Sequence, residues 1–157
     1  DGLKLVDERI EGGEPVADIL VTSTDLHGVE IGGDMIPRML DEVPILAVAA
    51  CFATGDTVIR DAAELRVKET DRIDTTVTEM TRLGANIESW EDGMVIHGKS
   101  ELNGAECQSH GDHRLAMSMA VAGLLGNGEV IVHGAADASV SYPEFWQHLK
   151  LLVEDVR

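Results

Sequence analysis

Aromatic side chains are scarce in this 157-residue sequence, at 3% of the residues, although 44% of the residues are hydrophobic. A core must therefore consist mainly of Ala, Val, Ile, Leu and Met. Proline occurs four times against sixteen glycines, which favours a regular structure of many short elements. No apolar run approaches the ~20 residues that a membrane-spanning helix needs. We therefore expect a packed chain with no membrane partner.

Cysteine is also rare, since only Cys51 and Cys107 are present. Two thiols without a disulfide-rich pattern favour reduced cysteines and a cytoplasmic location. The sequence opens with DGLKLVDERIEGGEP, which lacks an initiator Met and the cationic and apolar regions of a signal peptide. We expect residues 1–157 to form a single domain or a fragment of a longer protein.

Positively charged residues are few: Lys and Arg number 12 against 29 Asp and Glu, so the formal net charge is −17. A field of this sign repels nucleic acid and anionic membrane surfaces, and we expect neither as a partner. An anionic substrate would need a local cluster of cations. Such a cluster is present in LRVKETDRI, residues 65–73, which contains Arg66, Lys68 and Arg72.

Two stretches of the sequence, residues 41–83 and 112–153, repeat one pattern. Each begins with Asp and continues as an apolar helix, a glycine turn, a Val-Ile strand, a loop and a second helix. A partial third copy is suggested by the similarity of residues 17–31 to residues 85–107. A period this long indicates a few stacked supersecondary units.

The first helix of each copy, expected at residues 44–54 and 114–125, is apolar on every face. A helix of this kind is buried in a core or a membrane, and these two are too short for a membrane. Strands are expected around Val58-Ile59 and Val130-Ile131. Strand segments alternate in polarity, as in NIESWEDGMVIHG with EDG as a hairpin turn, so they should have one wet face. The sequence therefore predicts an α/β (α+β) fold of repeated βαβαββ units, with helices buried inside and sheets outside.

Charged residues gather where the expected helices begin. Asp41 and Asp112 directly precede the two buried helices, where each is either a helix cap or a functional carboxylate. A further helix is expected at about residues 71–83 with Thr70 as its cap, and a helix N-terminus attracts anions. If the repeats pack side by side, the helix starts share one edge. That edge would hold a phosphate-handling acid–base site made of Asp41, Lys68, Glu69, Arg72 and Arg114.

Other candidate sites have less support. His113 is either catalytic or simply packed against its neighbours. The remaining histidines lack metal-ligand spacing, and the sequence has no CxxC or HExxH motif. GGDMIPR matches neither a phosphate loop nor GxGxxG. We expect no metal site and no organic cofactor.

Three motifs together, LRVKETDRI, GDHRLAMS and MLDEVPILAVAA, resemble the C-terminal portion of the 5-enolpyruvylshikimate-3-phosphate synthase family. The closing VSYPEFWQHLKLL is similar to that family too, so the resemblance covers the chain from about Ala17 onward. RVKETDR and DHR at this separation form a specific pair, whereas either alone would be a weaker signal. The resemblance implies an inside-out α/β barrel of the enolpyruvyl transferase type.

The same resemblance implies a transferase of the shikimate pathway, which leads to chorismate and the aromatic amino acids. In that family the 5-hydroxyl of shikimate 3-phosphate attacks C2 of phosphoenolpyruvate while C3 is protonated, and the tetrahedral intermediate then loses phosphate. The proton-accepting aspartate, which also contacts substrate, falls on Asp41, and the proton-donating glutamate falls on Glu69. Lys68 falls on a lysine that contacts shikimate 3-phosphate. Arg72 and Arg114 fall on the arginines that bind phosphoenolpyruvate.

The sequence departs from the family in two places. Some members carry a lysine just before an aromatic-Pro pair, where this chain has Val140-Ser141-Tyr142-Pro143. Other members also lack that lysine, so we expect a difference between branches rather than loss of activity. The N-terminal domain of the family, with its serine, arginine and lysine contacts, is missing here. We therefore expect the chain to form one wall of an active site, with that domain as its partner, and to be inactive alone.

Other interpretations compete with this one. UDP-N-acetylglucosamine enolpyruvyl transferase shares the fold and the donor, but the KETDR–DHR pair argues against it. A cyclase with similar repeats would act on RNA, which the acidic charge does not suit. The chain could also be a non-catalytic binding module whose carboxylates cap helices and whose arginines form surface pairs, and composition alone favours that. Five charged residues at equivalent helix starts favour the enzyme.

Overall fold

The computed structural model describes residues 2–154 as a mixture of short helices and strands. The strands are β1 Leu3–Glu11, β2 Glu14–Val21, β3 Glu30–Ile31, β4 Asp56–Ile59, β5 Asn86–Trp90, β6 Gly93–His97, β7 Glu106–Gln108 and β8 Ile131–His133. The α-helices are α1 Val43–Cys51, α2 Arg72–Arg82, α3 His113–Leu125 and α4 Phe145–Glu154. The 3₁₀ helices are η1 Gly33–Arg38, η2 Leu40–Glu42, η3 Ala63–Val67 and η4 Ala135–Val140.

The order of elements repeats along the chain. β3-α1-β4-α2-β5-β6 makes one βαβαββ unit, and β7-α3-β8-α4 follow in the order of its first four elements. Residues 41–83 and 112–153 therefore contain matching helices and strands. The division into one domain or a fragment stays a prediction. The strands of residues 17–31 and 85–107 do not correspond one to one. Strand β2 is the second strand of its hairpin, whereas β5 is the first strand of its hairpin.

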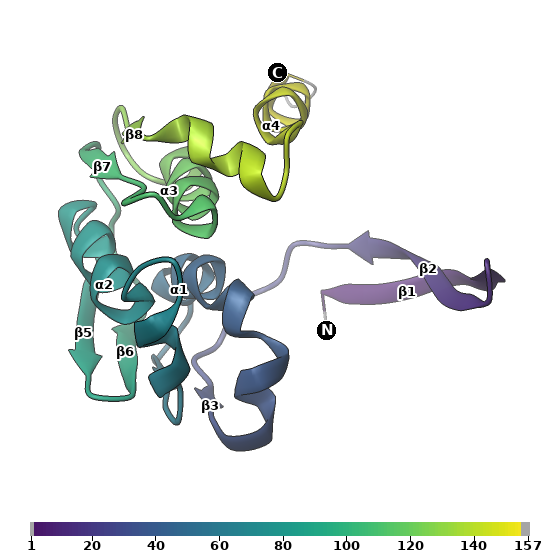
Figure 1. The fold of residues 1–157 in the computed structure, drawn as a ribbon, viewed down its shortest axis with the longest axis horizontal. Coiled ribbons are helices and arrows are strands. Elements are labelled where there is room, and N and C mark those ends of the chain that lie inside the picture. Colours follow the sequence, from purple (N-terminus) through teal and green to yellow (C-terminus); the bar gives the residue numbers. More distant parts are fainter. Residues whose placement is uncertain (1, 155–157) are drawn as a thin grey trace.

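Two sheets lie beside the helices. The larger has the strand order β3-β4-β6-β5, in which β3 and β4 are parallel and the other neighbours are antiparallel. Trp90 pairs with Gly93 across the turn between β5 and β6, which confirms the EDG hairpin turn. Strands β7 and β8 form a second, parallel pair. Figure 1 shows α1, α2 and α3 stacked together with β5, β6, β7 and β8 at their margin.

The main core lies between α1, α2, α3 and the larger sheet. Its helix side chains are mostly small or unbranched, and the fully buried ones include Ala47, Cys51, Met80 and Met119. Small residues let the helices approach closely, and methionines fill irregular gaps between them. Burying each large side chain of this core contributes roughly 1.5–3 kcal/mol. This packing holds the N-termini of α2 and α3 next to each other.

Burial of the two apolar helices is less complete than we expected. Helix α1 leaves Ile45 38% exposed, Phe52 directly after it is 36% exposed, and α3 leaves Leu124 and Leu125 exposed at its end. Ile45 faces a groove of about 230 Å³ between α1, α3 and the start of α4, which explains its exposure. Strand β6 is more buried than we expected, because we predicted one wet face for the strands and Gly93–Ile96 are all buried. Its two edges are hydrogen-bonded to β4 and β5, and the wet face that we expected is absent from Gly93–Ile96.

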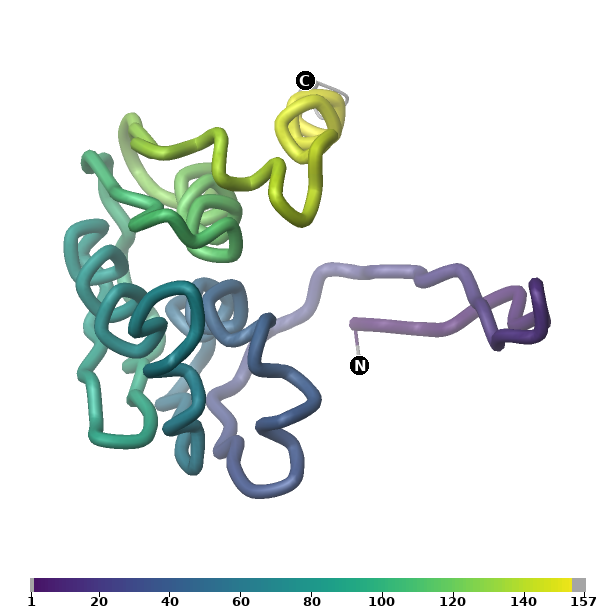
Figure 2. The backbone as a smooth tube through the Cα atoms, in the orientation of Figure 1, coloured from purple at the N-terminus to yellow at the C-terminus, as the bar shows by residue number. Residues whose placement is uncertain are grey.

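The β1–β2 hairpin extends away from the remainder of the molecule, as Figures 1 and 2 show. Leu3 pairs with Val21 and Leu5 with Ile19, and all four side chains are exposed. The hairpin therefore presents an apolar face to solvent. Within residues 2–154, no helix is long and apolar enough to cross a membrane.

Candidate active site

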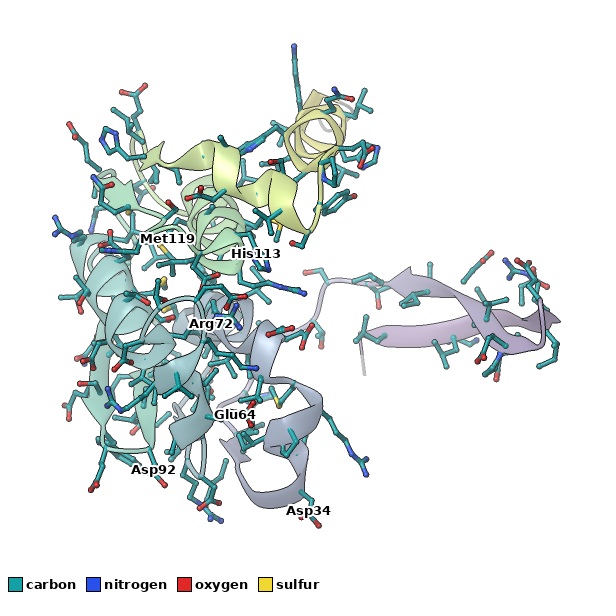
Figure 3. All side chains as sticks on the ribbon, in the orientation of Figure 1. Asp34, Glu64, Arg72, Asp92, His113 and Met119 are labelled. Carbon is teal, nitrogen blue, oxygen red and sulfur yellow. The ribbon has the colours of Figure 1, made fainter. Side chains whose placement is uncertain are left out.

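Arg72, the first residue of α2, lies where α1, α2 and α3 meet, and its side chain is 1% exposed (Figure 3). It donates from Nε to Asp112 Oδ2 at 2.6 Å and from Nη1 to Asp41 Oδ1 at 2.7 Å. Its Nη2 donates to Glu69 Oε2 at 2.6 Å. One guanidinium thus gathers three carboxylates from three separate segments, in the fork geometry that only arginine provides.

The start of α2 fixes the position of this guanidinium. Asp71 caps the helix, because its Oδ1 accepts a hydrogen bond from the backbone N–H of Asp74 at 3.1 Å. Our prediction of Thr70 as the cap was wrong by one residue. The Thr70 hydroxyl instead contacts the hydroxyl of Thr75 at 3.1 Å, and Asp71 takes the non-helical conformation that a cap requires.

Asp41 and Asp112 have different structural roles despite their equivalent places in the repeats. Asp112 is the fully buried cap of α3 and accepts from the backbone N–H of Arg114 at 2.8 Å, which confirms the cap interpretation for this residue. Asp41 lies in η2, and α1 begins after Glu42 without a side-chain cap. The cap interpretation of Asp41 is therefore wrong, and its carboxylate is half-exposed beside Arg72.

The charges of the cluster reinforce one another. The hydrogen bond from Arg72 lowers the pKa of Asp41, burial opposes this in part, and the positive charges of Arg72, Arg114 and Lys68 add to it. Burial works against the charged form of Arg72, but hydrogen bonds to Asp112 and Asp41 raise its pKa overall. Asp41 is thus held as a carboxylate at neutral pH. A carboxylate in this state can accept a proton.

Arg114 and Lys68 keep more open positions than Arg72. The terminal nitrogens of Arg114 lie 3.7 Å from oxygens of Asp41 and Glu42, which is longer than a hydrogen bond. Its buried Nε has no hydrogen-bond partner in the described structure. Lys68 Nζ lies 3.2 Å from Glu64 Oε1. Both cations therefore retain donors for an anion beside Asp41.

A pocket of about 290 Å³ opens at Asp41 and Lys68 and is also lined by Arg38, Glu42 and Glu64. Its lining combines cations and carboxylates, so a phosphorylated ligand with hydroxyl groups would find partners of both kinds. Two larger hollows, of about 490 Å³ each, are lined by the β1–β2 hairpin and the segment after it. None of the five predicted site residues lines these hollows, whereas Asp41 and Lys68 line the smaller pocket, and we place the candidate site there.

The structure brings all five predicted site residues together, although Arg72 is more enclosed than a substrate-binding arginine would be. For Arg72 to reach phosphoenolpyruvate directly, Asp41 or Glu69 would have to turn aside. Its role in binding that substrate stays a prediction. His113, which the sequence left open, is 9% exposed at the start of α3. Within residues 2–154, no group of three or more His, Cys, Asp or Glu side chains is arranged to hold a metal ion.

Sequence reasoning missed two features of the site. It left Asp112 as either a helix cap or a functional carboxylate and did not include it in the site, yet Asp112 is the fully buried partner of Arg72. The DHR motif was the available signal for it. It also counted Arg66 in the cationic cluster of residues 65–73 without a separate role, whereas the Arg66 side chain bonds to Asp71 and to the turn between β5 and β6.

Comparison with known proteins places these residues in a family. The family model described as EPSP synthase (3-phosphoshikimate 1-carboxyvinyltransferase) matches residues 3–149. The 3-phosphoshikimate 1-carboxyvinyltransferase of Roseiflexus castenholzii is 57% identical over 97% of this chain, and that of Herpetosiphon aurantiacus is 54% identical over the same share. This chain covers 35% of each of these two relatives.

Solved structures agree with the sequence matches. EPSP synthase from Acinetobacter baumannii superposes with a TM-score of 0.87 at 40% identity, over 92% of this chain and 34% of that one. The enolpyruvyl transferase NikO from Streptomyces tendae has a TM-score of 0.69 at 19% identity, over 93% of this chain and 31% of that one, which shows the fold alone. The predicted enolpyruvyl transferase-type α/β fold is thereby confirmed. The chain, which spans about a third of the length of these relatives, belongs to the EPSP synthase family.

Proposed function

We propose that this chain is part of an enzyme that transfers the enolpyruvyl group of phosphoenolpyruvate to the 5-hydroxyl of shikimate 3-phosphate. The products would be 5-enolpyruvylshikimate 3-phosphate and inorganic phosphate. The observation that carries the proposal is the Arg72 cluster, whose two terminal nitrogens hold Asp41 and Glu69. Membership of the EPSP synthase family supports the same reaction.

Asp41 and Glu69 would perform the two proton transfers of the addition. Asp41 accepts the proton of the 5-hydroxyl as that oxygen forms a bond to C2 of phosphoenolpyruvate, and Glu69 donates a proton to C3. The bond between C2 and the phosphate oxygen then breaks, which releases phosphate from the intermediate. The loss of a proton from C3 restores the double bond between C2 and C3. Asp41 is in the ionised form that a base needs, and its half-exposed carboxylate lines the pocket, while Arg72 makes it a weaker base than a free carboxylate.

Lys68 and Arg114 would bind the anionic parts of the two substrates. Arg114 has an unpartnered Nε and only long contacts from its terminal nitrogens, so a phosphate or carboxylate could take these donors. Lys68 lines the pocket beside Asp41. Fixed cations at these places would stabilise the charge of the leaving phosphate without having to reorganise.

The remainder of the enzyme would supply the opposite wall of the site. The chain covers about a third of the length of its relatives. It exposes Ile45 on α1, Phe52 directly after α1 and an apolar face on the β1–β2 hairpin. Such surfaces indicate contact with another part of the protein. We propose that the partner is the N-terminal domain of the same enzyme and that the enzyme acts in the cytoplasm.

The proposal is tested with the full-length enzyme that contains this segment. We expect phosphate release that requires both phosphoenolpyruvate and shikimate 3-phosphate, with the enol ether product identified by NMR. Turnover with UDP-N-acetylglucosamine in place of shikimate 3-phosphate, or no turnover with either acceptor, would contradict the proposal.

A further inference from the structure

The Arg66 side chain bonds away from the pocket although it belongs to the same short motif as Lys68 and Arg72. Its Nε donates to the backbone carbonyl of Glu91 at 2.6 Å, and its Nη2 donates to the carbonyl of Trp90. Its Nη1 donates to Asp71 Oδ2 at 2.8 Å and lies 3.1 Å from an oxygen of Asp74. Arg66 therefore joins η3, the first turn of α2 and the turn between β5 and β6.

These bonds close a short loop that carries two of the predicted site residues. Arg66 and Asp71 form an ion pair across the segment, and only Val67, Lys68, Glu69 and Thr70 lie between them. Asp71 serves both ends of the arrangement, because one carboxylate oxygen caps α2 and the other accepts from Arg66. Residues 67–70, which we call the crest of the loop, are thus held at both ends, by Arg66 and by Asp71.

Apolar packing does not hold the crest in place. The Val67 side chain is 79% exposed, so burial contributes little to the position of the residues beside it. Lys68 contacts Glu64 at 3.2 Å, and Glu64 is itself largely exposed, so this pair adds little. Arg72 bonds to Glu69 and Thr75 contacts Thr70, but both contacts are made by side chains. Without the polar bonds of Arg66, the backbone of the loop would gain conformational freedom that folding must otherwise remove.

We propose that Arg66 is a positioning residue that holds Lys68 and Glu69 in their places at the active site, an inference that rests on the function proposed above. Arg72 does not depend on the same bonds, because the fully buried Asp112 fixes its Nε. A lysine at position 66 cannot reproduce the role, since an ammonium group lacks the planar fork that reaches two carbonyls and a carboxylate at once. Loss of Arg66 should therefore affect Lys68 and Glu69 more than Arg72 and Arg114.

Steady-state kinetics of R66K and R66Q in the full-length enzyme test the proposal. Misplacement of a catalytic group by about 1 Å can cost about 10²-fold in rate, and we expect kcat to fall by roughly 10–10²-fold. The KM for shikimate 3-phosphate should rise more than the KM for phosphoenolpyruvate. Lys68, which we expect to contact shikimate 3-phosphate, would be displaced, whereas Arg72 and Arg114 would keep their positions. R60Q is the matched control: Arg60 also makes two ion pairs, with Glu30 and Asp61, and neither partner belongs to the loop. Its kinetics should match those of the wild type.

Amide hydrogen exchange provides a second measurement that does not require activity. In R66K the amides of residues 67–70 should exchange faster while those of β4 and β6 keep their protection. If R66K and R66Q fail to fold, D71N replaces them, because Asn at position 71 can still cap α2 but cannot form the ion pair with Arg66. The amides of residues 67–70 should exchange faster in D71N as well. Unchanged exchange in the loop, or wild-type kcat and KM values in R66K, would overturn the proposal. Faster exchange in an enzyme whose wild type has no turnover would support the loop tie while refuting the proposed function.

Discussion

Arg72 is the residue on which the site depends most, because its guanidinium group contacts three carboxylates. It is buried with Asp112, and its terminal nitrogens hold Asp41 and Glu69 at the edge of solvent. Removing one partner of a buried pair leaves an uncompensated charge, which is far more costly than loss of an exposed pair. Arg114 has longer contacts and is one-third exposed, so it contributes less to stability.

R72M and R114M should therefore differ in stability. R72M leaves the Asp112 carboxylate buried without its partner, and we expect it to lower the free energy of unfolding by about 3–5 kcal/mol. R114M should lower it by less than about 1 kcal/mol while it weakens phosphoenolpyruvate binding in the full-length enzyme. Urea unfolding followed by circular dichroism measures the first effect, with R60M as a surface control. Equal unfolding midpoints for R72M and R114M would contradict this assignment.

At the scale of elements, α2 is connected to the segment before α3 at two places. Arg72 binds Asp112 at one end of the helix, and near the other end the fully buried Glu79 accepts from the backbone N–H of Gln108 at 3.0 Å. A ring nitrogen of His110 lies 2.8 Å from the other oxygen of Glu79. The two connections together set the position of α3, and with it Arg114, relative to α2.

Loss of the Glu79 carboxylate should loosen this connection. E79L leaves the Gln108 N–H without an acceptor, and we expect a loss of about 1–3 kcal/mol in unfolding free energy. E79Q keeps one acceptor and should lose less. Amide exchange at Gln108 reports the change directly, faster in E79L than in E79Q, with E88Q on exposed β5 as the control. Equal protection of that amide in all three variants would show that Glu79 does not hold the loop.

The sequence was informative about elements whose residues share one local pattern. The runs of Ala, Val, Leu and Met predicted α1 and α3, and the EDG segment predicted the β5–β6 turn. The prediction of Thr70 as the cap was wrong because we expected the helix to begin at residue 71, whereas Asp71 is itself the cap. The bonds of Arg72 to Asp112 and of Glu79 to His110 join residues 40 and 31 positions apart. No local pattern identifies such partners, since they depend on how the helices pack.

At the scale of the whole molecule, residues 2–154 have a well-packed core and at least two uncovered apolar surfaces. One is the groove beside Ile45, and the other is the face of the β1–β2 hairpin that carries Leu5 and Ile19. Asp41 in η2 and Lys68 directly after η3 line a pocket that opens to solvent rather than an enclosed cavity. One wall of an active site has this form, because closure by a second domain orients reactants and excludes water.

The isolated 157-residue chain should accordingly be folded but inactive or nearly so. Its core should give a cooperative thermal transition in circular dichroism, whereas its turnover of phosphoenolpyruvate and shikimate 3-phosphate should be at most a trace of that of the full-length enzyme. The full-length enzyme under the same conditions is the control. A rate in the isolated chain comparable to that control would refute the one-wall proposal.

The most direct test of the account is the kcat of D41N and E69Q in the full-length enzyme. Both amides preserve shape, and Asp41 is not a helix cap, so the fold and the affinity for both substrates should be retained. A general acid or base typically contributes ~10²–10⁴-fold in rate, and we expect kcat to fall by at least 10²-fold in each variant. Circular dichroism and equilibrium binding of both substrates provide the controls. Near-normal kcat in both variants would show that neither carboxylate transfers a proton and would contradict the proposed active site.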